Sequence, residues 1–328
     1  MHKPKKIFIT GGGGYVGSML VRELLNRNFF VLALDLFTYG ETLIKHKNLK
    51  IVKGDIRDIE LIKKNITDTN IFIHLACISN DPSFELNPTL GKEINFDSFE
   101  PIVKVAKTSG IEKFIYASSS SVYGLKSEQN VTEEASLKPL TDYSKYKAMC
   151  EDILLKYNDR NFTCTILRPA TVCGFSYRQR FDLIVNILTN NAYNKNQIIV
   201  YGGDQLRPNI HIQDMILAYI KIIEADKKII SGEIFNAGFE NKKVIDLANK
   251  VKKIISNNVE IILKKTDDNR SYHISSKKIY KILAYEPTFT IDDAIIELVS
   301  KFKNKTFFDP LNNENYYNIK KLKKIYDN

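Results

Sequence analysis

Between Lys6 and Arg168, short apolar runs alternate with amphipathic segments, and this rhythm constrains the fold more than any other feature of the sequence. Short runs that are apolar throughout are typical of parallel strands buried on both faces, and the segments between them are typical of crossover helices. The candidate strands are residues 7–10, 30–35, 49–55, 71–76, 113–119 and 163–168, and the candidate helices are residues 16–26, 58–65, 95–109 and 143–156. The sequence therefore predicts an α/β fold built on one doubly wound parallel sheet.

After Arg168 the pattern loosens. Turn residues precede an apolar helical segment at 213–225, and two further helical patterns and a candidate strand at 259–265 follow. These pieces suit a smaller C-terminal α/β domain that crosses back to the sheet. We expect residues 1–172, with 211–238 returning to them, to form the sheet domain, and residues 173–210 with 239–328 to form the smaller one. A ligand is expected between the two.

Composition and charge exclude several classes of protein. A chain of 328 residues with 44% hydrophobic content can bury a sizeable core. The formal charge of +10 favours anionic partners, but the excess lysines lie on helix faces and in the tail from Lys301 to Lys324, as on a solvated surface. We therefore predict no nucleic-acid partner. Four separated cysteines predict neither disulfides nor a metal site. Without a signal sequence or a membrane-length apolar run, the chain is expected to be cytoplasmic, with no membrane partner.

The segment IFITGGGGYVG places glycines between the first strand and the first helix. Gly11, Gly14 and Gly17 stand where a tight turn, a close approach of the backbone to a pyrophosphate and close helix–strand packing all require glycine. The backbone of Tyr15 and Val16 would then lie at a helix N-terminus that binds phosphates. Since glycine clusters also form ordinary turns, this motif alone is weak evidence.

The second strand ends in Asp35, about twenty residues beyond the glycines, where a carboxylate accepts hydrogen bonds from the ribose hydroxyls of NAD. A 2′-phosphate would be repelled there, and the next three residues include no Arg, so the sequence predicts NAD rather than NADP. The alternative is a surface Asp that closes a strand. Four further residues, at the ends of the third and fourth strands, are expected to line the cofactor or to be core and loop: Asp55, Ile56, Leu75 and Ala76.

Tyr143 and Lys147 are one helical turn apart and project from the same face. A neighbouring ammonium favours the phenolate form of a tyrosine, which is otherwise a poor base at neutral pH. A solvated helix face would have the same spacing. The serine-rich end of the preceding strand supports the chemical interpretation, because a doubly wound fold places its ligand at that edge. Ser119 is the candidate to bond the reacting oxygen.

The order and spacing of several motifs resemble the extended short-chain dehydrogenase/reductase family, specifically its nucleotide-sugar epimerases and dehydratases. The motifs are GGGGYVG, the strand-terminal Asp35, GDIRD, HLA, SSSSVYG, YSKYK, LRPATVCG and RPNIHIQD, and the resemblance covers about the whole chain. It implies an NAD-binding Rossmann domain and a smaller nucleotide-sugar-binding domain. It also implies that Tyr143 is the base, that Lys147 is its electrostatic partner and ribose ligand, and that Ser119 is the hydrogen-bonding hydroxyl.

Two departures from the family pattern bear on the reaction. Where 4,6-dehydratases carry an Asp-Glu pair, this chain has Ser120 and Ser121, which cannot act as the carboxyl groups that eliminate water. Thr171 and Cys173 replace an Asn and a Tyr of many hexose epimerases. The resemblance therefore implies a 4-dehydrogenase or a 4-epimerase, and is closest to enzymes that act on GDP-linked sugars such as manno-heptose for surface or capsular polysaccharide.

A nucleotide diphosphate sugar calls for arginines, which form paired bonds to phosphates. The resemblance assigns Arg207 and Arg270 to the diphosphate. Arg178 and Arg180 are nearby candidates that could equally be solvated, and Ser79, Asn80 and Ser120 could face the sugar. The family also commonly forms homodimers, here through the helices at 95–109 and 143–156, although their apolar positions could be plain core.

Two other functions stay open. One is an NAD-dependent reductase of a carbonyl compound that is not a nucleotide, with Arg207 and Arg270 structural. The other is a non-catalytic NAD-sensing or RNA-binding protein that retains the fold.

Overall fold

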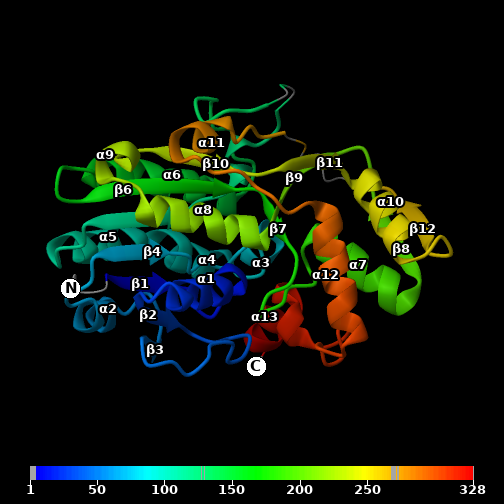
Figure 1. The fold of residues 1–328 in the computed structure, drawn as a ribbon, viewed down its shortest axis with the longest axis horizontal. Helices are drawn as coiled ribbons and strands as arrows, with labels where there is room; N and C mark the ends of the chain where they lie inside the picture. The colour runs from blue at the N-terminus through cyan, green and yellow to red at the C-terminus, as the bar shows by residue number, and fades with distance from the viewer. Residues whose placement is uncertain (1–4, 127, 129, 267–270, 272, 328) are drawn as a thin grey trace.

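A seven-stranded parallel sheet forms the centre of the computed structural model, which describes residues 5–126, 128, 130–266, 271 and 273–327 (Figure 1). The strand order is β10-β6-β5-β4-β1-β2-β3. Its strands are β1 (Lys6–Thr10), β2 (Phe30–Asp35), β3 (Leu49–Lys53), β4 (Ile71–His74), β5 (Lys113–Ala117), β6 (Thr163–Pro169) and β10 (Ile234–Ala237). The predicted doubly wound α/β fold is confirmed.

Aromatic side chains in register stabilise the middle of the sheet. Phe8, Phe72 and Phe114 are partners on the adjacent strands β1, β4 and β5, and their rings stack with centroids 5.0 and 4.9 Å apart. All three are fully buried. Parallel strands that are covered on both faces need such apolar runs, and for this reason these strands can be predicted from the sequence.

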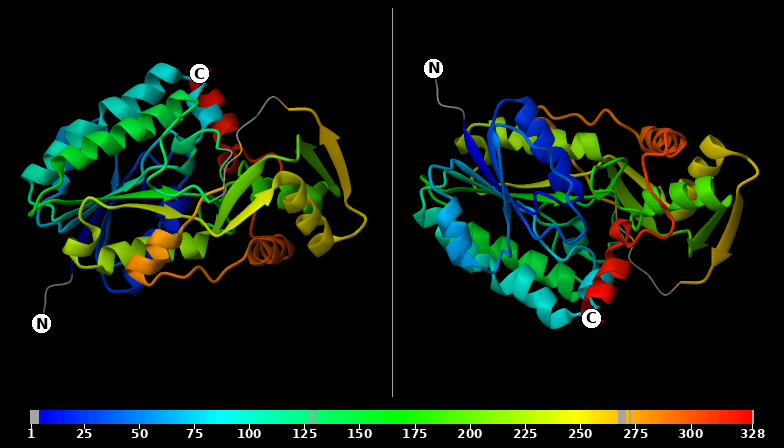
Figure 2. Two further views of the ribbon diagram at one scale, coloured as in Figure 1. Left: turned by 90° about the horizontal axis from the view of Figure 1, so that it is seen from above. Right: turned by 90° about the horizontal axis from the view of Figure 1, so that it is seen from below.

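Helices cover the two faces of the sheet, as the two views of Figure 2 show. One layer contains α1 (Tyr15–Asn26) and α8 (Ile212–Glu224), which contact each other. The other contains α2 (Ile59–Asn65), α5 (Phe99–Thr108) and α6 (Asp142–Tyr157). Short α9 (Lys227–Ile230) leads into β10. Each layer packs its own apolar cluster against the sheet.

The predicted helix at 95–109 has the wrong start. The helical segment begins at α4 (Pro88–Lys92), passes through a π-helical turn at Glu93–Asp97 and continues as α5. Asn95 explains the irregularity, since its buried side chain bonds both the N–H and the C=O of Ile78, at 2.8 and 2.9 Å. The strands β3, β4 and β5 also end two residues earlier than predicted, because their last polar and small residues already form the loops of the site.

The second part of the chain forms two small sheets. β7 (Thr171–Cys173), β9 (Leu206–His211) and β11 (Glu240–Lys243) make one, and β8 (Gln197–Tyr201) pairs with β12 (Glu260–Lys264) in the other. The predicted strand at 259–265 corresponds to β12. Three helices pack together on them: α7 (Ile184–Lys195), α10 (Val244–Ile255) and α12 (Ile291–Lys303). α11 (Lys277–Leu283) instead contacts β10 of the large sheet.

The C-terminal tail is not the solvated surface that its lysines suggest. A 3-10 turn at Glu314–Tyr316 precedes α13 (Asn318–Tyr326), which contacts the short helix α3 (Asp81–Phe84) after β4. Figure 2 shows α13, in red, beside the cyan helices of the first half. Asn318 and Leu322 are buried, while Lys320, Lys323 and Lys324 are exposed. Every third or fourth residue of this helix faces the protein, so a strongly charged stretch still packs.

Candidate active site

The glycine loop after β1 has no room for side chains. Gly11 has a φ of 75°, and a Cβ there would lie 2.7 Å from the backbone nitrogen of Ala76. At Gly17, in the first turn of α1, a Cβ would lie 2.1 Å from the carbonyl oxygen of Gly11. Gly14 precedes α1 without a side-chain cap. The uncapped end of this helix therefore fits a phosphate group, as the dinucleotide interpretation requires.

Asp35 ends β2 with its carboxylate fixed by the same loop. It accepts hydrogen bonds from the backbone N–H groups of Gly13, at 2.9 Å, and Phe37, at 2.7 Å. Burial raises the pKa of Asp35 above its ordinary value, and these two bonds oppose the shift. A half-buried, oriented carboxylate next to a glycine loop suits the ribose of a dinucleotide.

The other predicted cofactor residues line the same edge of the sheet in different ways. The Tyr15 hydroxyl donates to Gly174 at 2.8 Å, so its side chain ties α1 to the loop after β7 and only its backbone remains at the helix end. Val16 is half-buried against the core. The Asp55 carboxylate is bonded by Arg57, at 2.8 Å. Ile56 is buried, and Leu75 and Ala76 follow β4 beside the glycine loop.

The structure brings Ser119, Tyr143 and Lys147 together at the end of β5. The Ser119 hydroxyl accepts bonds from the N–H of Ser121 at 3.1 Å and from its hydroxyl at 2.8 Å, which leaves its own hydrogen for Tyr143, to which it is also hydrogen-bonded. The Lys147 ammonium donates to the carbonyl oxygen of Ala117 at 2.6 Å and lies 5.9 Å from the centre of the Tyr143 ring.

The electrostatics around Tyr143 oppose ionisation in the absence of a ligand. Burial raises the pKa of its hydroxyl well above the ordinary value, and Cys77 and Asp81 add to this shift. The Arg180 guanidinium and the hydrogen bond from Ser119 act in the other direction. A positive charge brought next to Tyr143 would therefore have a large effect on its pKa.

Three side chains from distant parts of the chain converge near Tyr143. The Ser79 hydroxyl accepts hydrogen bonds from Arg180, at 3.2 Å, and from the side-chain amide of Asn318, at 3.0 Å. Asp182 holds Arg180 through two bonds, at 2.8 and 3.1 Å, and accepts the backbone N–H of Asn318 at 3.0 Å. Leu322 packs in a cluster with Tyr143. The C-terminal helix thus belongs to the site.

Asn318 and Asp182 were not predicted as site residues. Asp182 has a local signal, because it follows Arg180 by two positions in a polar segment. Burial opposes ionisation of Asp182, but Arg180 holds its pKa below the ordinary value. No local signal identifies Asn318, which is 239 residues from Ser79 along the chain.

Of the remaining residues predicted to bind substrate, three have local structural contacts or are buried, and the fourth is not described. The side-chain oxygen of Asn80 accepts the N–H of Ser83 and caps α3. Ser120 is buried at the start of a 3-10 turn. Arg207 lies on β9, half-buried, and bonds the carbonyl oxygen of Leu206 at 3.1 Å. Arg270 lies outside the residues that the structure describes.

A comparison with family models matches residues 7–238 to the NAD dependent epimerase/dehydratase family. The chain belongs to this family. The resemblance to extended short-chain dehydrogenases is therefore confirmed, and NAD is the cofactor, as predicted. Among relatives of this epimerase/dehydratase, a UDP-glucose 4-epimerase from Lactobacillus helveticus is 26% identical over 75% of the chain and 81% of the relative. A dTDP-D-glucose 4,6-dehydratase from Homo sapiens is 25% identical over 98% of the chain and 93% of the relative.

Solved structures of family members show the same fold. A UDP-glucose 4-epimerase from Thermotoga maritima, crystallised with UDP-glucose, superposes with a TM-score of 0.84 at 22% identity and covers 92% of this chain and 100% of its own. A dTDP-glucose 4,6-dehydratase from Streptomyces venezuelae, with NAD bound, superposes with a TM-score of 0.84 at 22% identity. This match covers 93% of this chain and 99% of the dehydratase. Epimerases and dehydratases share the fold, so the reaction must be argued from residues.

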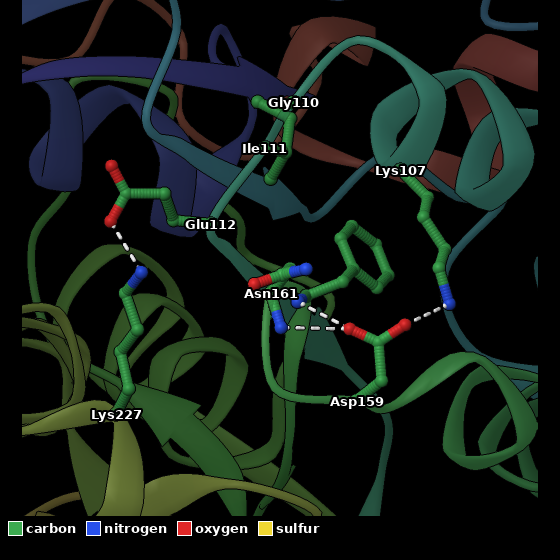
Figure 3. Close-up of a pocket in the computed structure, with 8 residues that line it drawn as sticks. Lys107, Gly110, Ile111, Glu112, Asp159, Asn161 and Lys227 are labelled. Atoms are coloured by element: carbon green, nitrogen blue, oxygen red, sulfur yellow. Dashed lines mark hydrogen bonds and ion pairs between the residues drawn. The ribbon is translucent and has the colours of Figure 1, made fainter.

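A separate hollow of about 440 Å³ lies at the opposite edge of the sheet, where β5 and β6 begin (Figure 3). Its charged groups are already paired, with Lys107 against Asp159 and Lys227 against Glu112, each at 2.6 Å. It is remote from the carboxyl ends of the strands, where doubly wound folds bind ligands. Within the described ranges, no three His, Cys, Asp or Glu side chains are placed to hold a metal ion, and no helix is long and apolar enough to span a bilayer.

Proposed function

We propose that this chain oxidises C4 of a nucleotide-activated sugar and acts as a 4-dehydrogenase or a 4-epimerase. The observation that carries the proposal is the convergence of Tyr143, Ser119 and Lys147 at the end of β5, on the same edge of the sheet as the glycine loop. A phenol, an alcohol and an ammonium are the groups that removal of a proton from a sugar hydroxyl requires.

Each residue then has a distinct task. Tyr143 would accept the proton of the C4 hydroxyl, and a 4-keto sugar would remain. NAD, when bound, would supply the acceptor for the hydride of C4. Ser119, whose hydrogen is directed by the two bonds from Ser121, stabilises the oxygen from which the proton leaves. Lys147 and Arg180 supply the positive charges that favour ionisation of the buried Tyr143.

Ser120 and Ser121 argue against dehydration. Elimination of water needs a carboxyl group as acid and another group as base, and neither serine can provide one. Ser121 is instead committed to Ser119. The 4-keto sugar is therefore either released or reduced again from its other face.

Ser79 is proposed as a donor to a sugar oxygen. Its oxygen already accepts two N–H bonds, so its own hydrogen is the one atom left to direct toward a ligand. Arg207 and Arg270 are proposed to bind the diphosphate. The base is proposed to be guanine and the sugar a manno-heptose or a related sugar of surface or capsular polysaccharide, on the motif resemblance. We also propose a homodimer that pairs α5 and α6.

The test is incubation with NAD and with GDP-, UDP- and dTDP-linked sugars, followed by mass spectrometry and NMR. Loss of two hydrogens indicates a dehydrogenase, and a changed configuration at C4 indicates an epimerase. Loss of water would contradict the argument from Ser120 and Ser121. If no nucleoside diphosphate binds in calorimetry, the reductase of a non-nucleotide carbonyl is favoured. Binding of NAD without turnover of any sugar would favour the sensor.

A further inference from the structure

Arg178 is a buried cation with an unused donor. Arg178 is 4% exposed, and its Nε atom has no hydrogen-bond partner within the described part of the chain. One terminal nitrogen donates to the side-chain oxygen of Asn318, and the guanidinium lies 3.8 Å above the ring of Tyr39. A buried guanidinium that leaves a donor unpaired is costly unless an anion completes it.

The acidic side chains around it do not fill this role. The Asp182 carboxylate is occupied by the two bonds from Arg180. Asp35 is close enough to act on Arg178 electrostatically, but its carboxylate accepts hydrogen bonds from the backbone of Gly13 and Phe37. Burial, together with Arg180, lowers the pKa of Arg178 to about 10. The site therefore favours an incoming negative charge.

The chain around Arg178 follows the dinucleotide site. Its backbone N–H lies 3.3 Å from the hydroxyl of Ser18, in α1, and Ser176 bonds the carbonyl oxygen of Tyr15 at 2.6 Å. Two residues later, Arg180 reaches Ser79 on the sugar side. Arg178 thus lies between Asp35, where the ribose of the cofactor is expected, and Ser79, where the sugar of the substrate is expected. It is also next to α1, whose N-terminus is expected to face phosphates.

We propose that Arg178 is a ligand of the diphosphate of NAD, and that Asn318 of α13 holds its guanidinium in position. A guanidinium fork binds two phosphate oxygens at once, and the unpaired Nε is one of the donors that such a fork uses. The proposal gives the C-terminal helix a part in cofactor binding. It does not depend on which sugar the enzyme uses.

The test measures affinities of the full chain for NAD, ADP-ribose, adenosine and GDP by calorimetry or by competition. Arg178→Met is expected to weaken the affinity for NAD and for ADP-ribose by about tenfold to a hundredfold. This loss corresponds to one or two charge-assisted hydrogen bonds. Adenosine, which has no phosphate, should bind as before. Arg160→Met, at an exposed arginine, is the matched control and should change nothing.

Three results would overturn the proposal: unchanged affinity for ADP-ribose, equal weakening of adenosine and ADP-ribose, or weakening confined to GDP, which would assign Arg178 to the substrate's diphosphate. Circular dichroism checks that each variant folds. If Arg178→Met does not fold, Arg178→Lys keeps the charge but loses the fork, and is expected to weaken ADP-ribose by about threefold or more. Equal affinity of this variant and the unchanged chain would also contradict the proposal.

Discussion

Asn318, at the start of the last helix, donates a hydrogen bond to the hydroxyl of Ser79, in the loop after β4, at 3.0 Å. The same hydroxyl accepts Arg180 from the segment after β7. Three stretches of chain that are far apart in sequence therefore fix one hydroxyl next to Tyr143, with which Leu322 of the same last helix packs. The site is closed by the C-terminus.

Tyr143→Phe should lower turnover of the sugar substrate by about a hundredfold or more, because it removes the group proposed as general base. Affinity for NAD, measured by calorimetry, should not change. Tyr146→Phe is the matched control on the same helix, since Tyr146 packs on Phe84 and Phe96 rather than on Ser119. Full activity of Tyr143→Phe would contradict the catalytic assignment.

Ser79→Ala should raise the KM for the sugar nucleotide by about tenfold, since one directed hydrogen bond is lost and Arg180 and Asn318 lose their common acceptor. Steady-state kinetics with NAD saturating measure this effect. Ser83→Ala is the control, because its buried hydroxyl has no hydrogen-bond partner within the described chain. A fall in kcat at unchanged KM would show that Ser79 does not bind substrate in the ground state.

Glu151→Gln should reduce the free energy of unfolding by about 3–5 kcal/mol, because it leaves the Arg168 guanidinium buried without its counter-charge. Glu151 and Arg168 are each 2% exposed and are joined by bonds of 2.6 to 3.2 Å. Urea unfolding measures the change. Glu224→Gln, which affects an exposed ion pair with Arg27, should leave the midpoint nearly unchanged. Similar midpoints for both variants would refute the argument.

The stability of the protein should fall as the pH drops below about 6.5, because of His74. Burial, together with Lys147, lowers the pKa of this imidazole to about 3. Between this pH and about 6.5, the imidazole is therefore protonated in the unfolded chain and neutral in the folded chain. The loss is about 2 kcal/mol between pH 6.5 and 5. Comparing urea midpoints with His74→Gln, whose side-chain amide can still form a hydrogen bond with the Thr10 hydroxyl, isolates this contribution. Parallel pH curves for the two proteins would exclude it.

The proposed dimer predicts that Met149→Asp produces monomers in light scattering. Met149 is 44% exposed on α6, where a partner helix would bury it. Ile296→Asp is the control, at an apolar residue that is 55% exposed on α12. Three apolar positions of α5 give no support, because Ile102, Val103 and Ala106 are fully buried in the chain's own core. An unchanged mass for Met149→Asp would contradict the proposed interface.

Much of the sheet and the cofactor loop could be predicted because their signals are local. Gly17 is required by its contact with Gly11 within one strand–turn–helix unit, and the pair Tyr143 and Lys147 follows from one helical turn. Strand β10 was expected only as a return of the chain to the sheet. The irregular start of α5 escaped prediction, because it depends on Asn95 reaching Ile78 across the fold.

By itself, then, the sequence determined the parallel sheet, the dinucleotide loop and the residues at the end of β5, since periodicity and short spacing encode them directly. Only the tertiary structure decided that the lysine-rich C-terminus closes the site, that Asn318 contacts both Ser79 and Arg178, and that Arg178 is buried with a donor to spare. The reason is physical: these contacts join residues that are 140 and 239 positions apart in the chain, and no local pattern records where the chain returns.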